Sequence, residues 1–307
     1  MTKAFTRPVF YRWLIPVLLE WAAIIGLFAI GFAMHHWLVW VFVVILLGSR
    51  QQALGLLGHD GSHYTASRNI RLNDFTSALF CFWPALTSLG DYRRLHLNHH
   101  RYLNTERDPE LIFKTKVCPR QWHARASRGR IAAFFLSDLF GFGLIEVMQA
   151  RNLLRMRGPY FAYIPENSRP AEWKSWVGPI VWLFCITTLL YLTGYLFALL
   201  IWFAALGTSF WAFLRLRSWT EHPLPTTAGS AEIKAFPPES ATHFVRLNWW
   251  QRLFIAPHNS WAHYEHHKHP GVPFWRLKEI GRDDTGRSSD PQRTQRLGEL
   301  FASFERS

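Results

Sequence analysis

Long apolar runs, separated by polar and basic stretches, divide the chain into predicted membrane-spanning segments. The first two runs cover about residues 13–33 and 37–57 and are separated by a Met-His-His link. The second two cover about residues 176–193 and 195–214 and are separated by Gly194. A helix needs roughly 20 apolar residues to cross the hydrocarbon core, and each run approaches that length. The pattern therefore predicts an all-α integral membrane protein with four transmembrane helices in two hairpins.

The polar remainder of the chain is expected to form a helical cap on one side of the membrane. We assign the cap to residues 58–175 and 215–280, followed by a charged tail at 281–307 with little apolar periodicity. No repeat or low-complexity segment divides the sequence, so we interpret residues 1–307 as a single domain. No small-residue cleavage site follows the first apolar run, which we therefore expect to be a retained span rather than a signal peptide.

The distribution of basic residues predicts which side of the membrane the cap faces. The two short links at 34–36 and 193–195 contain no Lys or Arg, whereas segments 3–12, 68–174 and 215–306 contain nearly all of these residues. Cytoplasmic loops are enriched in Lys and Arg. Both termini and the cap should therefore face the cytoplasm. This topology also accounts for the net charge of +13, so we expect no nucleic-acid partner.

Three short histidine-rich boxes carry the candidate chemistry. They read H-D-G-S-H, H-L-N-H-H and H-Y-E-H-H, and they contain eight of the fifteen histidines. On a helix, positions i, i+3 and i+4 share one face, so each box aims its imidazoles at one point. Neutral imidazole suits iron, zinc, copper and nickel, and the boxes therefore predict a shared metal site. The eight residues are His59, His63, His96, His99, His100, His263, His266 and His267.

The order and form of the boxes resemble those of the membrane fatty acid desaturase and hydroxylase superfamily. That family has H-x-x-x-H after its second span, H-x-x-H-H after a short apolar insertion, and H-x-x-H-H after a second pair of spans. The flanking residues agree, because Asn104–Glu110 is similar to the family's N-T-x-x-D-P-[DE] tail. After the third box, His269–Pro273 is similar to its H-x-x-P-x-V-P continuation. The resemblance covers most of the chain.

The resemblance implies a pair of irons held almost wholly by histidine, with one more ligand between the last span and the third box. The best candidate is His222 in R-S-W-T-E-H, which is similar to the R-x-x-x-E-H segment of bacterial desaturase-like proteins. Animal acyl-CoA desaturases have N-x-x-x-H at this site; Ser218 occupies the matching position here, and Asn259 could substitute by analogy. The implied metal ligands and catalytic residues are His59, His63, His96, His99, His100, His222, His263, His266 and His267.

By the same resemblance, we expect an O2-dependent non-haem di-iron enzyme that introduces a double bond into a fatty acyl chain of a lipid or thioester. Zinc could replace iron in recombinant protein, because it binds nitrogen sites more tightly than ferrous iron does. The electrons should come from a separate donor, a ferredoxin or a cytochrome with its reductase. We expect a multi-pass protein of a bacterial inner membrane with its active site in the cytoplasm.

Two other functions stay open on the sequence. Hydroxylation or ketolation of a carotenoid or other lipid is compatible with the motifs, because family ketolases also carry H-D-x-x-H and a P-x-V-P segment. A membrane metal-transport or metal-binding protein is the alternative from another class, but it would be expected to place its ligands within the bilayer. A zinc metalloprotease is disfavoured by the absence of H-E-x-x-H, whose glutamate serves as general base.

Acidic residues near the boxes are candidates for orienting the imidazoles. A carboxylate that accepts the second ring N–H fixes the tautomer and the direction of a metal-binding histidine. Asp60 and Glu221 rank first for this role, followed by Asp91, Asp108 and Glu265.

Overall fold

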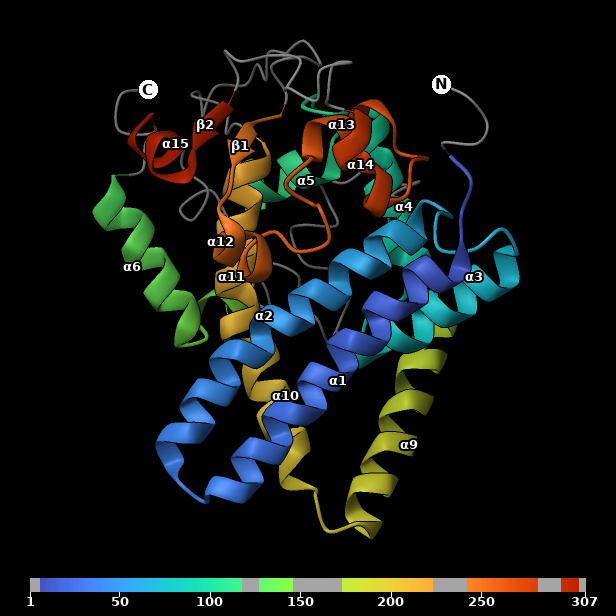
Figure 1. The fold of residues 1–307 in the computed structure, drawn as a ribbon, viewed down its shortest axis with the longest axis vertical. Coiled ribbons are helices and arrows are strands. Elements are labelled where there is room, and N and C mark those ends of the chain that lie inside the picture. Colours follow the sequence, from blue (N-terminus) through green and yellow to red (C-terminus); the bar gives the residue numbers. More distant parts are fainter. Residues whose placement is uncertain (1–5, 118–126, 146–172, 223–241, 281–293, 304–307) are drawn as a thin grey trace.

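The computed structural model describes residues 6–117, 127–145, 173–222, 242–280 and 294–303. Within these residues the protein is predominantly helical, and four helical segments are long and apolar enough to cross a membrane (Figure 1). The predicted all-α membrane architecture is therefore confirmed. Most of the predicted charged tail lies outside the described residues.

The first hairpin consists of α1 (Phe10–Met34) and α2 (Trp37–Ser62), which pack side by side. The link between them turns at His35, whose φ of 46° is in the left-handed region. Trp13 lies on the face of α1 toward α2 and donates to the Leu57 carbonyl at 2.9 Å. The opposite face exposes leucine and isoleucine side chains, as expected for a lipid-facing surface. α2 continues past the predicted end of its span, so the same helix carries the first histidine box.

The second hairpin consists of α9 (Val177–Leu192) and α10 (Phe197–Gly207), joined through Gly194. The φ of this glycine is 79°, a conformation that residues with a Cβ adopt only with strain, and the predicted tight turn is confirmed. After a break at Thr208, the chain continues as α11 (Ser209–Glu221). The last span is thus built from two consecutive helices.

A buried ion pair lets α11 extend beyond the predicted span boundary at residue 214. The apolar run ends at Arg215, but this side chain is buried and its Nη2 lies 2.9 Å from Oδ1 of Asp138. Asp138 belongs to α6 (Arg128–Leu139), which packs against α11. Because the charge is paired, a helix can carry Arg215 into the protein interior and continue toward the site.

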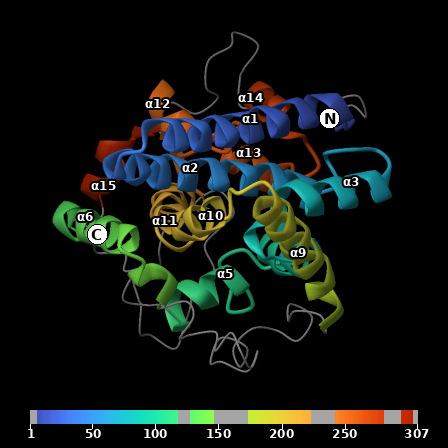
Figure 2. The same ribbon diagram turned by 90° about the horizontal axis from the view of Figure 1, so that it is seen from below.

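The central helix of the bundle is α2. It contacts α1 on one side and α10 and α11 on the other, so that these helices lie in successive layers when seen from below (Figure 2). The apolar window of α2 is 67% buried, compared with 33% or less in the other three candidate spans. A helix enclosed in this way is a rigid support for the histidines at its end.

The cap consists of short helices gathered at one end of the bundle (Figure 1). Two three-residue strands, β1 (Phe244–Arg246) and β2 (Thr294–Arg296), form a parallel pair. The sequence did not predict this pair, because strands this short have no alternating pattern of their own. The remaining helices of the cap are α3 (Ile70–Ser77), α4 (Leu89–Arg101), α5 (Pro109–Ile112), α12 (Trp249–Phe254), α13 (His263–Lys268), α14 (Phe274–Ile280) and α15 (Leu297–Ser303). Helical turns at Ala78–Phe82, Trp83–Ala85, Phe113–Val117 and Trp173–Trp176 extend or precede these helices.

Polar side chains of the first hairpin hold the segment that precedes the third box. Ser49 donates to the Phe254 carbonyl at 3.0 Å. Arg50 is buried and pairs with Glu20 of α1 at 3.1 Å. Glu20 in turn lies 3.0 Å from Nε2 of His258. The membrane-spanning helices therefore fix the loop from which α13 begins.

Candidate metal centre

Helices α2, α4, α11 and α13 bring the nine predicted histidines together at the cap end of the bundle. His59 lies in the last turn of α2, and His63 follows at its C-terminal cap. The second box lies on α4, the third lies on α13, and His222 follows the last residue of α11. The structure thus gathers all nine, and their role as metal ligands stays a prediction.

Five of the histidines form one group, here called the five-histidine cluster. It consists of His59, His63, His96, His100 and His266, whose ligand nitrogens lie within 4.8 Å of one another. The Nε2 atoms are 2.8 Å apart between His63 and His96, and 3.0 Å apart both between His96 and His100 and between His100 and His266. Nε2 of His59 is buried and has no hydrogen-bond partner among the described residues.

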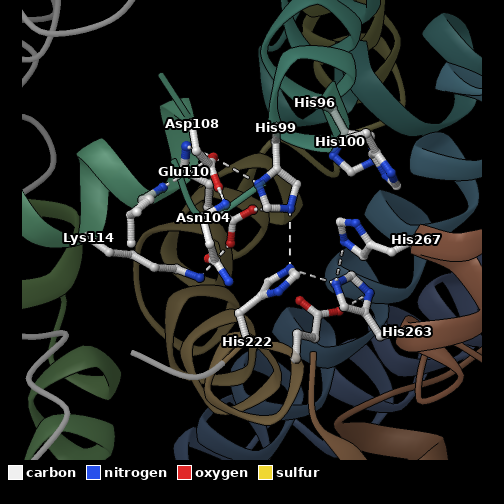
Figure 3. A network of polar contacts seen from close by, with 12 residues as sticks. His96, His99, His100, Asn104, Asp108, Glu110, Lys114, His222, His263 and His267 are labelled. Carbon is white, nitrogen blue, oxygen red and sulfur yellow. Dashed lines mark hydrogen bonds and ion pairs between the residues drawn. The ribbon is translucent and has the colours of Figure 1, made fainter. Parts of the chain in front are cut away.

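Three other histidines, His99, His222 and His267, form a second group with ligand nitrogens within 4.8 Å of one another (Figure 3). His263 adjoins it through Nε2 contacts with His222 and His267, and these four residues are here called the four-histidine cluster. Nε2 of His222 lies 3.2 Å from Nε2 of His99 and 2.8 Å from Nε2 of His263. Nε2 of His263 lies 3.1 Å from that of His267. Each of the four presents its Nε2 atom to a neighbour in the group.

The spacing of these nitrogens is the spacing expected around a cation. Two imidazole nitrogens bound at about 2.1 Å to one metal lie about 3.0 Å apart at a right angle and about 3.4 Å apart at the tetrahedral angle. The observed separations run from 2.8 to 3.2 Å. A neutral imidazole has only one N–H, so converging Nε2 atoms would otherwise leave lone pairs facing one another. The residues therefore fit two metal ions.

The tautomer of His99 is set by a carboxylate behind it. Nδ1 of His99 lies 2.9 Å from Oδ1 of Asp108. Asp108 is itself held by the backbone amides of Asn104, at 3.0 Å, and Glu110, at 2.9 Å. A proton on Nδ1 leaves the lone pair of Nε2 directed into the four-histidine cluster, as a metal ligand requires.

A comparison with known families agrees with this geometry. A sequence model described as fatty acid desaturase matches residues 35–293, which is most of the chain and includes the three boxes and His222. This chain belongs to the fatty acid desaturase family. It is therefore a desaturase-type oxidoreductase and, with its four apolar helices, a membrane protein.

Three curated members of this desaturase family are similar to the chain. Dihydrorhizobitoxine desaturase of Bradyrhizobium elkanii is 23% identical over 256 residues, which cover 81% of this chain and 70% of the relative. The sn-1 oleoyl-lipid 12-desaturase of Picosynechococcus sp. is 23% identical over 275 residues, covering 86% and 74%. The sn-1 oleoyl-lipid 12-desaturase of Arthrospira platensis is 30% identical over a shorter match of 80 residues, covering 26% and 22%. All three are named as desaturases; two share the name sn-1 oleoyl-lipid 12-desaturase, and the third is named for a different substrate.

The two carboxylates that ranked first in the sequence analysis have different contacts in this desaturase. Oε1 of Glu221 lies 3.3 Å from Nδ1 of His263 and also pairs with Arg217, but it forms no hydrogen bond with the ring. Asp60 instead accepts the backbone N–H of Phe274 at 3.2 Å, where α14 begins. Asp60 thus joins the first box to the segment that follows the third, whereas Asp108, ranked lower, contacts a box histidine directly.

The remaining polar residues that the sequence suggested for the site form their contacts outside the two clusters. Asp91 pairs with Arg94 three residues along α4. Glu265 is buried on α13, and within the part of the chain that the structure describes its Oε2 has no hydrogen-bond partner. The amide nitrogen of Asn259 donates to the Phe274 carbonyl at 3.1 Å. The expectation that Asn259 holds a water ligand stays a prediction, and the observed contact gives this residue a structural role.

One acidic residue at the site was not singled out from the sequence. Oε2 of Glu110 lies 3.5 Å from Nε2 of His99, and its Oε1 lies 2.5 Å from Nζ of Lys114. The only signal for it was its position as the last residue of the motif N-T-x-x-D-P-[DE], which marks the family without indicating a contact. The figure places Glu110 and Lys114 on the side of His99 opposite His267 (Figure 3).

Burial keeps most of the imidazoles neutral and so available as ligands. It lowers the pKa of His63 to about 4 and the pKa of His100 to about 2, since a buried charged ring loses its hydration. His99 differs: burial again favours the neutral ring, but the nearby carboxylates of Asp108 and Glu110 raise its pKa above the ordinary value. Burial lowers the pKa values of His96, His263, His266 and His267 well below the ordinary value.

Proposed function

We propose that this family member is an O2-dependent, non-haem di-iron enzyme that introduces a double bond into a fatty acyl chain carried by a lipid or thioester. The observation that carries the proposal is the pair of histidine clusters, whose Nε2 atoms converge at separations of 2.8–3.2 Å. A surface rich in histidine would not bury its rings or direct the same ring nitrogen of each toward its neighbours. The family match supports the reaction class.

The chemistry requires an oxidant that the chain cannot provide alone. Removing hydrogen from an unactivated methylene requires a strong oxidant made from dioxygen. Two irons bound in the clusters would bind dioxygen and supply this chemistry. Each new double bond removes two hydrogens from the acyl chain, and one O2 becomes two waters with two electrons and two protons from outside. The chain holds the ligands in place: Asp108 sets the orientation of His99, and Glu221 brings a carboxylate to 3.3 Å from Nδ1 of His263.

The electrons come, in this proposal, from a separate ferredoxin or from a cytochrome with its reductase. We place the protein in a bacterial inner membrane, with both termini and the active site on the cytoplasmic side. The distribution of Lys and Arg supports this orientation. The start of α1 and helix α15 also lie at the same end of the bundle as the site (Figure 1).

The fatty-acid profile of a bacterial host tests the proposal. The profile would be measured by gas chromatography with mass spectrometry in cells that make the wild-type protein and in cells that make equal amounts of His99→Ala. We expect new unsaturated chains with the wild type alone, and their fragmentation gives the bond position. The reason for the control is that His99 contributes to the four-histidine cluster and is fixed by Asp108.

Other outcomes of this experiment separate the alternatives. The fatty-acid profile of the cells could be unchanged while the protein purified from them binds two irons. That result would overturn the proposal of an acyl substrate but would agree with the proposed metal site. Carotenoids would then be supplied to the cells, and hydroxylated or keto products would identify the other lipid oxidation. Metal accumulation by the cells without any new lipid product would instead support a transport function.

A further inference from the structure

The two histidine clusters share one partly exposed edge. Six of the nine histidines are buried, whereas one histidine from each box is only partly buried: His63, His100 and His267. These three lie in a row, because the ring centre of His100 is 4.7 Å from that of His63 and 4.1 Å from that of His267. His63 and His100 belong to the five-histidine cluster, and His267 belongs to the four-histidine cluster. The row is therefore the part of the proposed metal centre that lies nearest the surface.

Tyrosines paired with basic side chains surround this edge. Each of its histidines has, close by in the sequence, a tyrosine whose ring contacts a Lys or Arg. A cation within about 6 Å of a ring centre is attracted to the face of the ring. The pairs, here called the basic rim, are Tyr64 with Arg93 at 3.9 Å, Tyr102 with Arg101 at 5.4 Å and with Arg107 at 5.9 Å, and Tyr264 with Lys268 at 5.9 Å.

Three cations of the basic rim are available to a partner. Arg101, Arg107 and Lys268 are exposed, and in the described part of the chain none of them has a carboxylate oxygen within 4.0 Å. Arg93, by contrast, is paired with Asp74. Glu106 is an exposed acidic residue of the same segment, so the rim keeps an excess of positive charge. Such a surface attracts a partner with a negatively charged face.

We propose that the basic rim is the docking surface for an acidic electron-carrier protein, whose electrons enter the metal centre through the edge formed by His63, His100 and His267. The inference rests on the proposed function, which takes two electrons from outside, and it names the surface where they enter. For each double bond, two one-electron carriers are oxidised and one O2 is reduced to two waters. Two of the four hydrogens in those waters come from the acyl chain, and two come as protons from solvent.

The path from the basic rim to the proposed ligands is short. Arg101 directly follows His100 in the chain, and Lys268 directly follows His267. A carrier that pairs with these two side chains therefore lies against the exposed edge of the clusters. The same edge serves both clusters, because the rings of His100 and His267 are stacked on each other (Figure 3).

The position of the basic rim favours a soluble partner over a lipid headgroup. Lys268 lies at the end of α13, and this helix is at the end of the bundle opposite the turns of the two hairpins (Figure 1). Helix α5, which begins just after Arg107, lies at the same end. Headgroups would instead meet exposed basic residues close to the spans, such as Arg12 in the first turn of α1. We therefore assign the rim to a protein and not to the membrane.

Binding of an acidic [2Fe–2S] ferredoxin to the purified protein in phosphatidylcholine nanodiscs tests this inference. We expect Arg101→Glu and Lys268→Glu each to raise the dissociation constant of labelled ferredoxin at least about tenfold, because each places like charges opposite one another. Raising the salt from about 0.05 to about 0.5 M, which shortens the screening length about threefold, should weaken binding to the wild type. Arg246→Glu is the matched control: it changes the net charge equally, and Arg246 is exposed on β1, which packs on α11 and α15.

Two further measurements separate docking from a structural role. Loaded with ⁵⁷Fe²⁺, the wild type and both rim variants should show the same two ferrous Mössbauer signals, because neither side chain is a proposed ligand. Protein that is reduced chemically before O2 is admitted should form equal product in a single turnover, since docking is then bypassed. With ferredoxin as the donor, the rim variants should have a KM for ferredoxin at least about tenfold higher and an unchanged kcat.

The other outcomes overturn the inference. Ferredoxin binding by the rim variants that equals binding by the Arg246→Glu control would refute the docking surface and leave the proposed function intact. Equal binding of an acidic acyl carrier protein would show a general attraction of acidic proteins. Rim variants that keep ferredoxin binding but lose affinity for phosphatidylglycerol vesicles would assign the rim to lipid headgroups. A chemically reduced wild type that forms no unsaturated product would overturn the proposed function and this inference together.

Discussion

The two histidine clusters are built from the same side chain, but their surroundings differ. In the described part of the chain, the carboxylate oxygens within 4.0 Å of a cluster histidine belong to contacts with His99 and His263, both in the four-histidine cluster. The five-histidine cluster has an additional imidazole in their place. A carboxylate that accepts a ring N–H makes the imidazole a stronger base. We therefore expect two unequal metals, with more negative charge around the one in the four-histidine cluster.

The clusters also share some helices and not others. α4 contributes His96 and His100 to one cluster and His99 to the other, because adjacent residues on a helix point about 100° apart. α13 divides its box in the same way. By contrast, α2 serves only the five-histidine cluster, and His222 at the end of α11 serves only the four-histidine cluster. Changes on α2 and α11 can therefore separate the two metals.

The largest effects should follow from removing a ligand that serves one cluster alone. His59→Ala should release the metal of the five-histidine cluster, and His222→Ala should release the other. Loss of a residue that only hydrogen-bonds to a metal ligand costs up to about 100-fold in activity. Because each of these variants removes a ligand itself, each should lower product formation by more than that. Iron per chain and lipid products measure both effects. Loss of both irons from either single variant would show that the clusters do not bind metal independently.

A smaller and one-sided effect is expected from Asp108→Asn. Asparagine can still cap α5 but can donate a proton toward Nδ1 of His99, so the preferred tautomer of the ring is no longer fixed. Iron in the four-histidine cluster should bind about 10- to 100-fold more weakly, while iron in the other cluster is unaffected. Chelator competition gives both affinities. Asp91→Asn is the control, because Asp91 pairs with Arg94 and should leave both affinities unchanged.

A change in the membrane-spanning contacts should instead affect both clusters together. Glu20 holds Arg50 and His258, and so fixes the loop that leads to α13. Glu20→Leu leaves the Arg50 charge buried without its partner, which costs about 3 kcal/mol or more. We expect a lower unfolding temperature and binding of both irons that is weaker by the same several-fold factor. Adding Arg50→Leu should recover part of the stability; selective loss of one iron would contradict the shared role of this loop.

Much of this architecture could be predicted from the sequence, because its signals are local. Apolar runs marked the four spans, and the spacing within each box marked helical faces that carry imidazoles. The division into two clusters could not be predicted, since it depends on how α4 and α13 meet α2 and α11. The contact of Glu20 with His258 joins residues 238 positions apart, and no local pattern indicates it. Glu110 lay in a quoted motif, but only the fold brings it to His99.

The smallest effect is expected at Asn259, where the sequence and the structure suggest different roles. By analogy with N-x-x-x-H sites, its side chain would hold a water on a metal, and Asn259→Ala would then disturb one cluster. In the structure its amide nitrogen donates to the Phe274 carbonyl at 3.1 Å, which joins the two segments flanking α13. Loss of this bond should cost about 1 kcal/mol of stability, measured by thermal unfolding. Both ferrous signals should stay as in the wild type, because the hydrogen bond lies outside both clusters; a change confined to the signal of the four-histidine cluster would instead assign Asn259 to the water ligand.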